Sequence, residues 1–270
     1  MKNTKAKGKI IVFEGIDGSG KSTQIKRVAK HIRKKYGRDV VISSWKNSAI
    51  VGDYLKKLNQ LEEQPSALAL SIIVAADLSE RIAKEILPAV EAGKIVLCDR
   101  YTYTGIIREE VVNNFDHDWL IDIYSFAPKP DLVLYFKVTD AISVQRVDSR
   151  MEEGLEKLAK KLRKKQGKVS KKKVAELVQK LKGSMSEGSI TGSMVETIKA
   201  IKKGEKLYQI NGDPLTEQIA NEQRLELVNK LIAAYDMWQK KEKFIEIDAM
   251  KTIKEVSRDI KQVLKKMLVN

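Results

Sequence analysis

Residues that form disulfide bonds and metal centres are scarce in this sequence, whose 270 residues include one cysteine and two histidines. The single cysteine, Cys98, excludes an internal disulfide and a cysteine-based zinc site, and His31 and His117 are too few and too far apart to predict a metal cluster. Long hydrophobic runs are also missing. The longest, at 68–76 and 95–98, are too short to cross a membrane, and the N-terminus lacks the apolar core of a signal peptide. We therefore expect a cytoplasmic protein without a membrane partner.

Acidic residues are outnumbered by basic ones, which gives the chain a formal net charge of +15. Much of the excess lies in one segment, because residues 151–183 contain 12 Lys or Arg and 4 Glu. Two interpretations remain open for this segment: a solvated basic helix, or a surface that attracts a polyanionic nucleotide or polyphosphate. The hydrophobic fraction of 43% is that of a globular protein with a sizeable core.

The stretch from Ile10 to Thr23 joins an apolar run of strand length to a glycine-rich turn, and a helical pattern follows it. The turn matches G-x-x-x-x-G-K-S, from Gly15 to Ser22, the pattern of a phosphate-binding loop. Its glycines allow backbone N–H groups to surround a phosphate at the positive end of the following helix. A chance glycine turn is the alternative, but the flanking strand and helix are the context that the motif requires. We therefore predict a nucleotide-binding P-loop.

Apolar strand patterns alternate with helical patterns along most of the chain. The expected strands are 9–14, 39–43, 94–98, 131–137 and 243–248. The expected helices are 21–36, 49–61, 66–92 with a kink at Pro88, 104–113, 118–126 capped by Asp116 or Asp118, 141–166, 171–182, 194–203, 215–240 and 252–268. This alternation predicts an α/β fold, a three-layer sandwich with a five-stranded parallel sheet and helices on both faces.

The domain organisation follows from where this alternation stops. Residues 1–8 form a basic N-terminal arm, and 9–150 together with 216–270 form the expected core. The segment 151–215 is highly charged and contains a glycine- and serine-rich stretch at 183–192. Because a core strand returns after it, we expect a helical lid or insertion rather than a second domain.

Several motifs and their spacing resemble the thymidylate kinase family, a branch of the P-loop nucleoside monophosphate kinases. They are FEGIDGSGKSTQ at 13–24, AAD at 75–77, ILPA at 86–89, GKIV at 93–96, DRY at 99–101, PDLVLYF at 130–136 and FIEIDA at 244–249. Together they span most of the chain outside 151–215. The resemblance implies ATP on the P-loop, Mg²⁺, an acceptor nucleotide in the adjacent cleft, and a homodimer.

The resemblance also implies roles for individual residues. The residues that would hold ATP are Gly15, Ile16, Asp17, Gly18, Ser19, Gly20, Lys21, Ser22 and Thr23. Lys21 would stabilise the transferring phosphoryl group, while Ser22 and Asp99 would hold Mg²⁺. Arg100 would grip the acceptor's phosphate with its guanidinium, and Asp17 would contact the acceptor's sugar or organise the metal's water. Structural alternatives remain: an ion pair between Asp99 and Arg100, and an Asp17 that only stabilises its own loop.

The acceptor site departs from the family's pattern. Where the family has Arg-Glu-Pro, this chain has Trp45-Lys46-Asn47, so that Lys46 supplies charge without a bidentate fork and Trp45 either stacks on a base or lies in the core. The family's base-contacting Arg is replaced by Leu78, with Arg81 one turn later. The remaining acceptor candidates are Tyr101, Thr104 and Glu109. Phosphate chemistry is thus retained, while base recognition is altered.

The P-loop contains no arginine, so the resemblance places the arginine that neutralises the transferring phosphoryl in the lid. Arg146 and Arg150 are spaced i, i+4 on one helical face, just after the fourth expected strand. The alternative for this pair is an ordinary solvated face.

We therefore predict a phosphotransferase that uses ATP to phosphorylate a nucleoside monophosphate, most simply dTMP to dTDP. One alternative keeps the fold and changes the substrates: a kinase of another nucleotide or small acceptor, driven by polyphosphate or ATP. Another is a nucleotide-regulated module that binds nucleic acid. The intact Lys21, Ser22, Asp99 and Arg100 argue against it, so we do not expect nucleic acid as a partner.

Overall fold

The computed structural model describes residues 7–44, 48, 65–164 and 214–269, and the statements below concern these residues. They divide into two compact units. The first comprises the described residues of Met1–Asp53, Pro65–Thr139 and Lys230–Asn270, and the second those of Asp140–Asn229. The division of the chain into a core of 9–150 and 216–270 and an insertion of 151–215 remains a prediction.

The first unit is built on a five-stranded parallel sheet, as predicted. Its strands are β1 (Lys9–Glu14), β2 (Val40–Ser44), β3 (Ile95–Asp99), β4 (Leu132–Lys137) and β5 (Ile245–Asp248). They lie in the order β2-β3-β1-β4-β5, with every neighbouring pair parallel. The predicted strand bounds are accurate to within two residues. Because all strands run the same way, their carboxyl ends meet at one edge of the sheet.

The central strands are apolar on both faces because helices cover both faces. Ile11, Val12 and Phe13 of β1 are fully buried, and so are the four residues 95–98 of β3. The Phe13 ring stacks on Phe136 of β4, with the ring centroids 5.6 Å apart. These strands form a rigid platform for the loops at their carboxyl ends.

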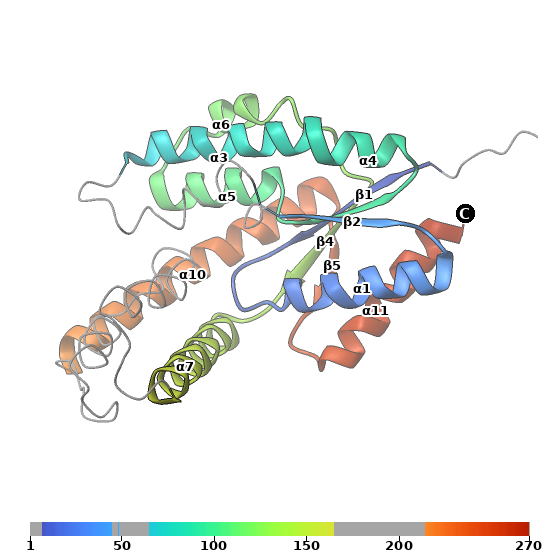
Figure 1. Ribbon diagram of the computed structural model, residues 1–270. Coiled ribbons are helices and arrows are strands. Elements are labelled where there is room, and N and C mark those ends of the chain that lie inside the picture. The colour runs from blue at the N-terminus through green and yellow to red at the C-terminus, as the bar shows by residue number, and fades with distance from the viewer. Residues whose placement is uncertain (1–6, 45–47, 49–64, 165–213, 270) are drawn as a thin grey trace, which may run out of the picture. The chain divides into compact units, whose positions relative to one another are not determined.

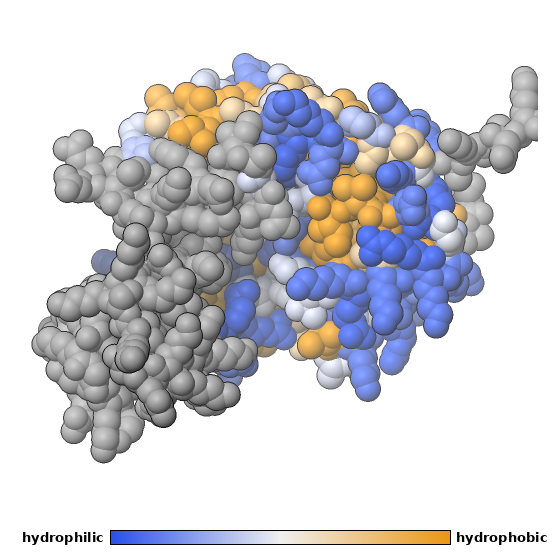
Figure 2. All heavy atoms as spheres, in the orientation of Figure 1, coloured by the Kyte–Doolittle hydropathy of each residue, from blue (hydrophilic) through white to orange (hydrophobic). Residues whose placement is uncertain are grey.

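Two helices cover one face of the sheet, and several cover the other (Figure 1). The first face carries α1 (Lys21–Tyr36) and α11 (Ile253–Val269). The other carries α3 (Ala67–Arg81), the π-helix η2 (Ile82–Ile86), α4 (Leu87–Glu91), α5 (Thr102–Asn113), α6 (His117–Ile123) and the last part of α10 (Pro214–Glu242). Figure 2 shows a hydrophilic surface over α1, whose Lys26, Lys30 and Lys34 are exposed.

The predicted helix 66–92 is one continuous helical run with a π turn in its middle. Ser66 caps its start by accepting a hydrogen bond from the N–H of Ala69. The sequence analysis predicts a kink at Pro88, and in the structure η2 immediately precedes this proline. Because Pro88 has no N–H to donate, the backbone bonding changes here, and Leu87 N–H donates to Ile82 O instead. The run ends at Gly93, whose φ of 79° is left-handed.

The second unit contains α7 (Asp140–Lys164) and the first part of α10. Within it, Asn229 donates to Asp140 at 3.0 Å, and Arg224 pairs with Asp148 at 2.8 Å. The elements predicted at 49–61, 171–182 and 194–203, and the glycine-rich stretch 183–192, lie outside the described residues.

None of the described helices combines the length and the apolar composition needed to cross a membrane.

Candidate active site

Three glycines shape the loop that joins β1 to α1. Gly15, Gly18 and Gly20 have φ angles of 134°, 76° and 87°, which side chains rarely adopt. At Gly15 the restriction is also steric, because a Cβ atom there would lie 2.7 Å from the carbonyl oxygen of Phe136 on β4. The glycine pattern of the sequence thus corresponds to a real backbone requirement, and the loop leads directly into the N-terminus of α1.

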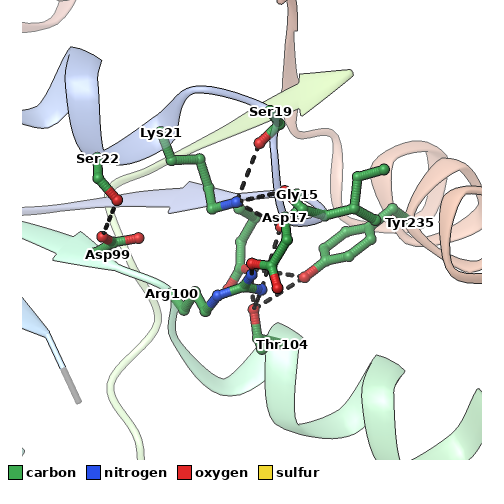
Figure 3. Close-up of polar contacts among 11 residues, drawn as sticks. Gly15, Asp17, Ser19, Lys21, Ser22, Asp99, Arg100, Thr104 and Tyr235 are labelled. Atoms are coloured by element: carbon green, nitrogen blue, oxygen red, sulfur yellow. Dashed lines mark hydrogen bonds and ion pairs between the residues drawn. The ribbon is translucent and has the colours of Figure 1, made fainter. Parts of the chain in front are cut away.

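Lys21, the first residue of α1, folds back over this loop (Figure 3). Its Nζ donates to Gly15 O at 2.7 Å, to Ile16 O at 2.8 Å and to Ser19 Oγ at 3.1 Å. Burial of the side chain, together with the positive charge of Arg100, lowers the pKa of Lys21 to about 7. The three hydrogen bonds fix the Lys21 amine at the place where the loop's N–H groups would surround a phosphate.

Ser22 and Asp99, the two predicted metal ligands, lie together. The Ser22 hydroxyl donates to Asp99 Oδ2 at 2.8 Å, although 77 positions separate the two residues (Figure 3). Within the described residues no group of three or more His, Cys, Asp and Glu could hold a metal by itself. A hydroxyl and a carboxylate nevertheless suit Mg²⁺, which is held by one or two protein oxygens together with substrate phosphates.

Arg100 follows β3 and extends across the P-loop. Its Nη2 pairs with Asp17, and its Nη1 donates to Gly15 O and to Thr104 Oγ1, each at 3.2 Å. Arg100 has a left-handed φ of 72°, which is uncommon for a residue with a side chain. The sequence analysis considered an ion pair between Asp99 and Arg100 as a structural alternative. In the structure Arg100 pairs with Asp17 instead, while Asp99 accepts from Ser22.

Glu14 and Tyr235 complete this cluster, and the sequence analysis assigned no role to either. Glu14 is fully buried and accepts hydrogen bonds from the Tyr101 N–H at 2.9 Å, the Thr104 hydroxyl at 2.5 Å and the Tyr235 hydroxyl at 3.1 Å. Burial raises the pKa of Glu14 above its usual value, although the hydrogen bonds from Thr104 and Tyr101 and the charge of Arg100 oppose the rise. The sequence could have drawn attention to Glu14, because it is a carboxylate at the end of an apolar strand. Nothing in the sequence pointed to Tyr235, which lies 221 positions away on α10.

The other predicted ATP-binding positions lie on the same loop. Ile16 and Ser19 are buried, and Thr23 begins the hydrogen bonding of α1 by donating to Gly20 O at 3.2 Å.

The predicted acceptor residues differ in how accessible their side chains are. Tyr101 is buried and donates to Pro128 O at 3.0 Å, and Glu109 accepts from Asn113 at 2.6 Å. Arg81 belongs to a largely buried cluster at the end of β2, where it pairs with Asp77 at 2.8 Å and donates to Ser43 at 3.0 Å. Trp45 and Lys46 lie outside the described residues. The assignment of these residues to the acceptor stays a prediction.

Arg146 and Arg150 both lie on α7, in the second unit. Arg146 is half-buried and Arg150 is exposed. Their predicted role at the transferring phosphoryl stays a prediction.

Comparison with known proteins identifies similar chains. The family model described as thymidylate kinase matches residues 13–201, more than half of the chain. A probable thymidylate kinase 2 of Saccharolobus solfataricus is 40% identical over 141 residues, which cover 52% of this chain and 64% of that protein. A probable thymidylate kinase of Pyrococcus horikoshii is 37% identical over 150 residues, with 53% and 72% covered. A thymidylate kinase of Desulfotalea psychrophila is 39% identical over 145 residues, with 53% and 69% covered.

Proposed function

Because this chain belongs to the thymidylate kinase family, we propose that it transfers the γ-phosphoryl group of ATP to a nucleoside monophosphate, converting dTMP to dTDP. One observation carries the proposal: a buried lysine, a hydroxyl–carboxylate pair and an arginine converge on a glycine loop at the carboxyl edge of a parallel sheet. Phosphoryl transfer depends on positioning two anions and neutralising their charge, and these groups are suited to that task.

The donor side of the reaction is assigned to the P-loop. Its N–H groups and the N-terminus of α1 would bind the phosphates of ATP, and Lys21 would bind the group being transferred. Ser22 and Asp99 would hold Mg²⁺, which neutralises phosphate charge when bound. Since Lys21 already bonds to loop carbonyls and to Ser19, phosphate would replace oxygen partners that the lysine already has.

The acceptor side is assigned to Arg100 and Asp17. Arg100 would bind the acceptor's phosphate through its planar guanidinium, and Asp17 would then be released to the acceptor's sugar or the metal's water. The similarity to proteins named as thymidylate kinases supports dTMP as the acceptor. Leu78 is buried on α3, so Arg81, held by Asp77 and Ser43, would be the cation that binds the acceptor in its place. We further propose a cytoplasmic homodimer.

The test is a phosphotransfer screen with ATP and Mg²⁺ against dTMP, dUMP, UMP, CMP, AMP and GMP. We expect dTMP to be phosphorylated fastest. Lys21→Ala should lower kcat by about 10²- to 10³-fold, the scale for the loss of one charge-stabilising group. Lys26→Ala, which removes an exposed lysine of the same helix, is the matched control and should leave kcat unchanged. Full activity of Lys21→Ala would contradict the assignment.

The two alternatives are tested in the same preparation. Polyphosphate is offered in place of ATP, and binding of DNA and RNA is measured against salt concentration. Neither alternative is supported by an observation on the described residues. Phosphorylation driven by polyphosphate alone, or a steep salt dependence of nucleic-acid binding in an inactive protein, would favour them.

A further inference from the structure

Tyr235 is a buried residue of α10 whose hydroxyl lies in the hydrogen-bond cluster beside the P-loop (Figure 3). The hydroxyl is 3.1 Å from Glu14 Oε2 and 2.9 Å from Thr104 Oγ1. Its aromatic ring stacks on Tyr135 of β4, with the ring centroids 5.4 Å apart and an angle of 11° between the rings. The stacked ring holds the hydroxyl in place and leaves it little freedom to turn away.

The hydrogen bonds of this cluster have a definite direction. Thr104 carries one proton, which it donates to Glu14 Oε2 at 2.5 Å, and its oxygen then accepts from Arg100 Nη1 at 3.2 Å. Since the Thr104 proton is already used, Tyr235 is the donor to Thr104 Oγ1 at 2.9 Å, and it shares this proton with the same Glu14 oxygen at 3.1 Å. Glu14 and Tyr235 therefore fix the Thr104 hydroxyl in the one orientation in which its oxygen faces Arg100.

Thr104 matters for Arg100 because, among the residues that the structure describes, it provides the hydrogen bond to the guanidinium that comes from outside the P-loop. The other two partners of the guanidinium, Asp17 and Gly15 O, belong to the loop that is proposed to bind ATP. The backbone of Arg100 is itself in an uncommon left-handed conformation, which the surrounding contacts must hold. Thr104 lies in the first turn of α5, a well-packed helix.

We propose that Tyr235 is a positioning residue for phosphotransfer: its hydroxyl orients Thr104, and Thr104 holds the Arg100 guanidinium where it binds the acceptor's phosphate. The inference rests on the proposed function of Arg100. It differs from the role of an ordinary core tyrosine, for which burial of the ring would suffice and the hydroxyl would be dispensable.

The first experiment compares Tyr235→Phe with Tyr135→Phe. Both variants remove one hydroxyl from the same stacked pair, but the Tyr135 hydroxyl bonds to Asp236 at 3.0 Å, outside the cluster. Tyr235→Phe should raise the KM for dTMP by about tenfold, the scale of one lost hydrogen bond, and leave the KM for ATP within about twofold. Tyr135→Phe should keep both constants within about twofold. An unchanged KM for dTMP in Tyr235→Phe, or an equal rise in Tyr135→Phe, would overturn the inference.

The second experiment asks whether Tyr235 acts through Thr104. Thr104→Val removes the hydroxyl between Tyr235 and Arg100, and the double variant Tyr235→Phe/Thr104→Val removes both hydroxyls. Since the two residues act in series, the double variant should raise the KM for dTMP no further than Thr104→Val alone does. If the KM of the double variant instead rises by the product of the two single fold-increases, the two hydroxyls act independently and the inference is overturned. Thr104→Val also perturbs the hydrogen-bond cluster without altering the stacked rings of Tyr135 and Tyr235.

A third measurement separates this inference from the proposed function. The Nε–H signal of Arg100 in the NMR spectrum reports the orientation of the guanidinium without any reaction. The signal should shift or broaden in Tyr235→Phe and stay unchanged in Tyr135→Phe. If the wild-type protein phosphorylates no acceptor, the proposed function fails, and this signal alone decides whether Tyr235 positions Arg100. An identical signal in all three proteins overturns the positioning role.

Discussion

Gly15 lacks a side chain at the point where β1 turns into the P-loop, and the structure shows two separate reasons for this. Its φ of 134° disfavours any side chain, and a Cβ would lie 2.7 Å from a backbone carbonyl of β4. Gly20 has a comparable φ of 87°, but a Cβ there would meet nothing within 4 Å. The two glycines therefore allow backbone strain and steric overlap to be measured separately.

We expect Gly15→Ala to lower the free energy of unfolding by about 3 kcal/mol, because strain and overlap both apply. Gly20→Ala should cost about 1 kcal/mol from strain alone. The measurement is urea unfolding of the protein without nucleotide, which keeps the effects on ATP binding out of the comparison. Equal losses in the two variants would contradict the steric reason for Gly15.

Among the elements, α6 shows how a single side chain determines where a helix begins. The sequence left Asp116 and Asp118 as alternative caps, and in the structure Asp116 Oδ1 accepts from the Trp119 N–H at 2.9 Å. Asp118 lies in the first turn of α6, where its negative charge can favour the helix dipole without capping it.

Asp116→Ala should lower the free energy of unfolding by about 1 kcal/mol, since it leaves a helix N–H without its partner. Asp118→Ala is the matched control and should cost about 0.3–0.5 kcal/mol, which 1 M salt should largely remove. Chemical denaturation at low and high salt measures both values. A larger loss in Asp118→Ala than in Asp116→Ala would reverse the assignment of the cap.

At the scale of the whole molecule, buried tyrosine hydroxyls link stability to alkaline pH. Burial raises the pKa of Tyr103 to about 12, and it also raises the pKa values of Tyr124, Tyr135 and Tyr235. In the unfolded chain these groups ionise near the ordinary tyrosine pKa of 10.0. Above that pH the unfolded state binds fewer protons than the folded state, so stability must fall as the pH rises.

The free energy of unfolding should therefore decrease from about pH 10 upward. Between about pH 7 and 10 it should rise, because the lowered pKa of Lys21 leaves the folded state with fewer bound protons than the unfolded state. A fully buried group such as Tyr235 contributes a slope of about 1.4 kcal/mol per pH unit. Urea unfolding at pH 8 to 11 measures the decrease. Tyrosinate absorbance should titrate later in the folded protein than in urea, and a single midpoint near 10 in the folded protein would contradict the prediction.

The sequence by itself determined the sheet, the P-loop and the family. Buried parallel strands appear in the sequence as short continuous apolar runs, so all five strands were predicted to within two residues, and the Gly15–Ser22 spacing identified the phosphate loop. The same pattern placed Asp99 at the carboxyl end of a strand, and the resemblance to the family then implied that Asp99 and Ser22 hold one metal ion. The sheet and the P-loop thus needed only local order, whereas the roles of these two side chains came from the resemblance.

Only the tertiary structure decided which side chains surround Arg100. Its pairing with Asp17 rather than Asp99, the direction of the Thr104 hydroxyl and the approach of Tyr235 from α10 depend on packing between distant segments. No periodicity encodes such contacts, because an amphipathic helix shows which face is buried but not which polar atom that face will meet. The arginine and its loop could be read from local sequence, whereas the partners that hold the arginine came together only when the helices packed on the sheet.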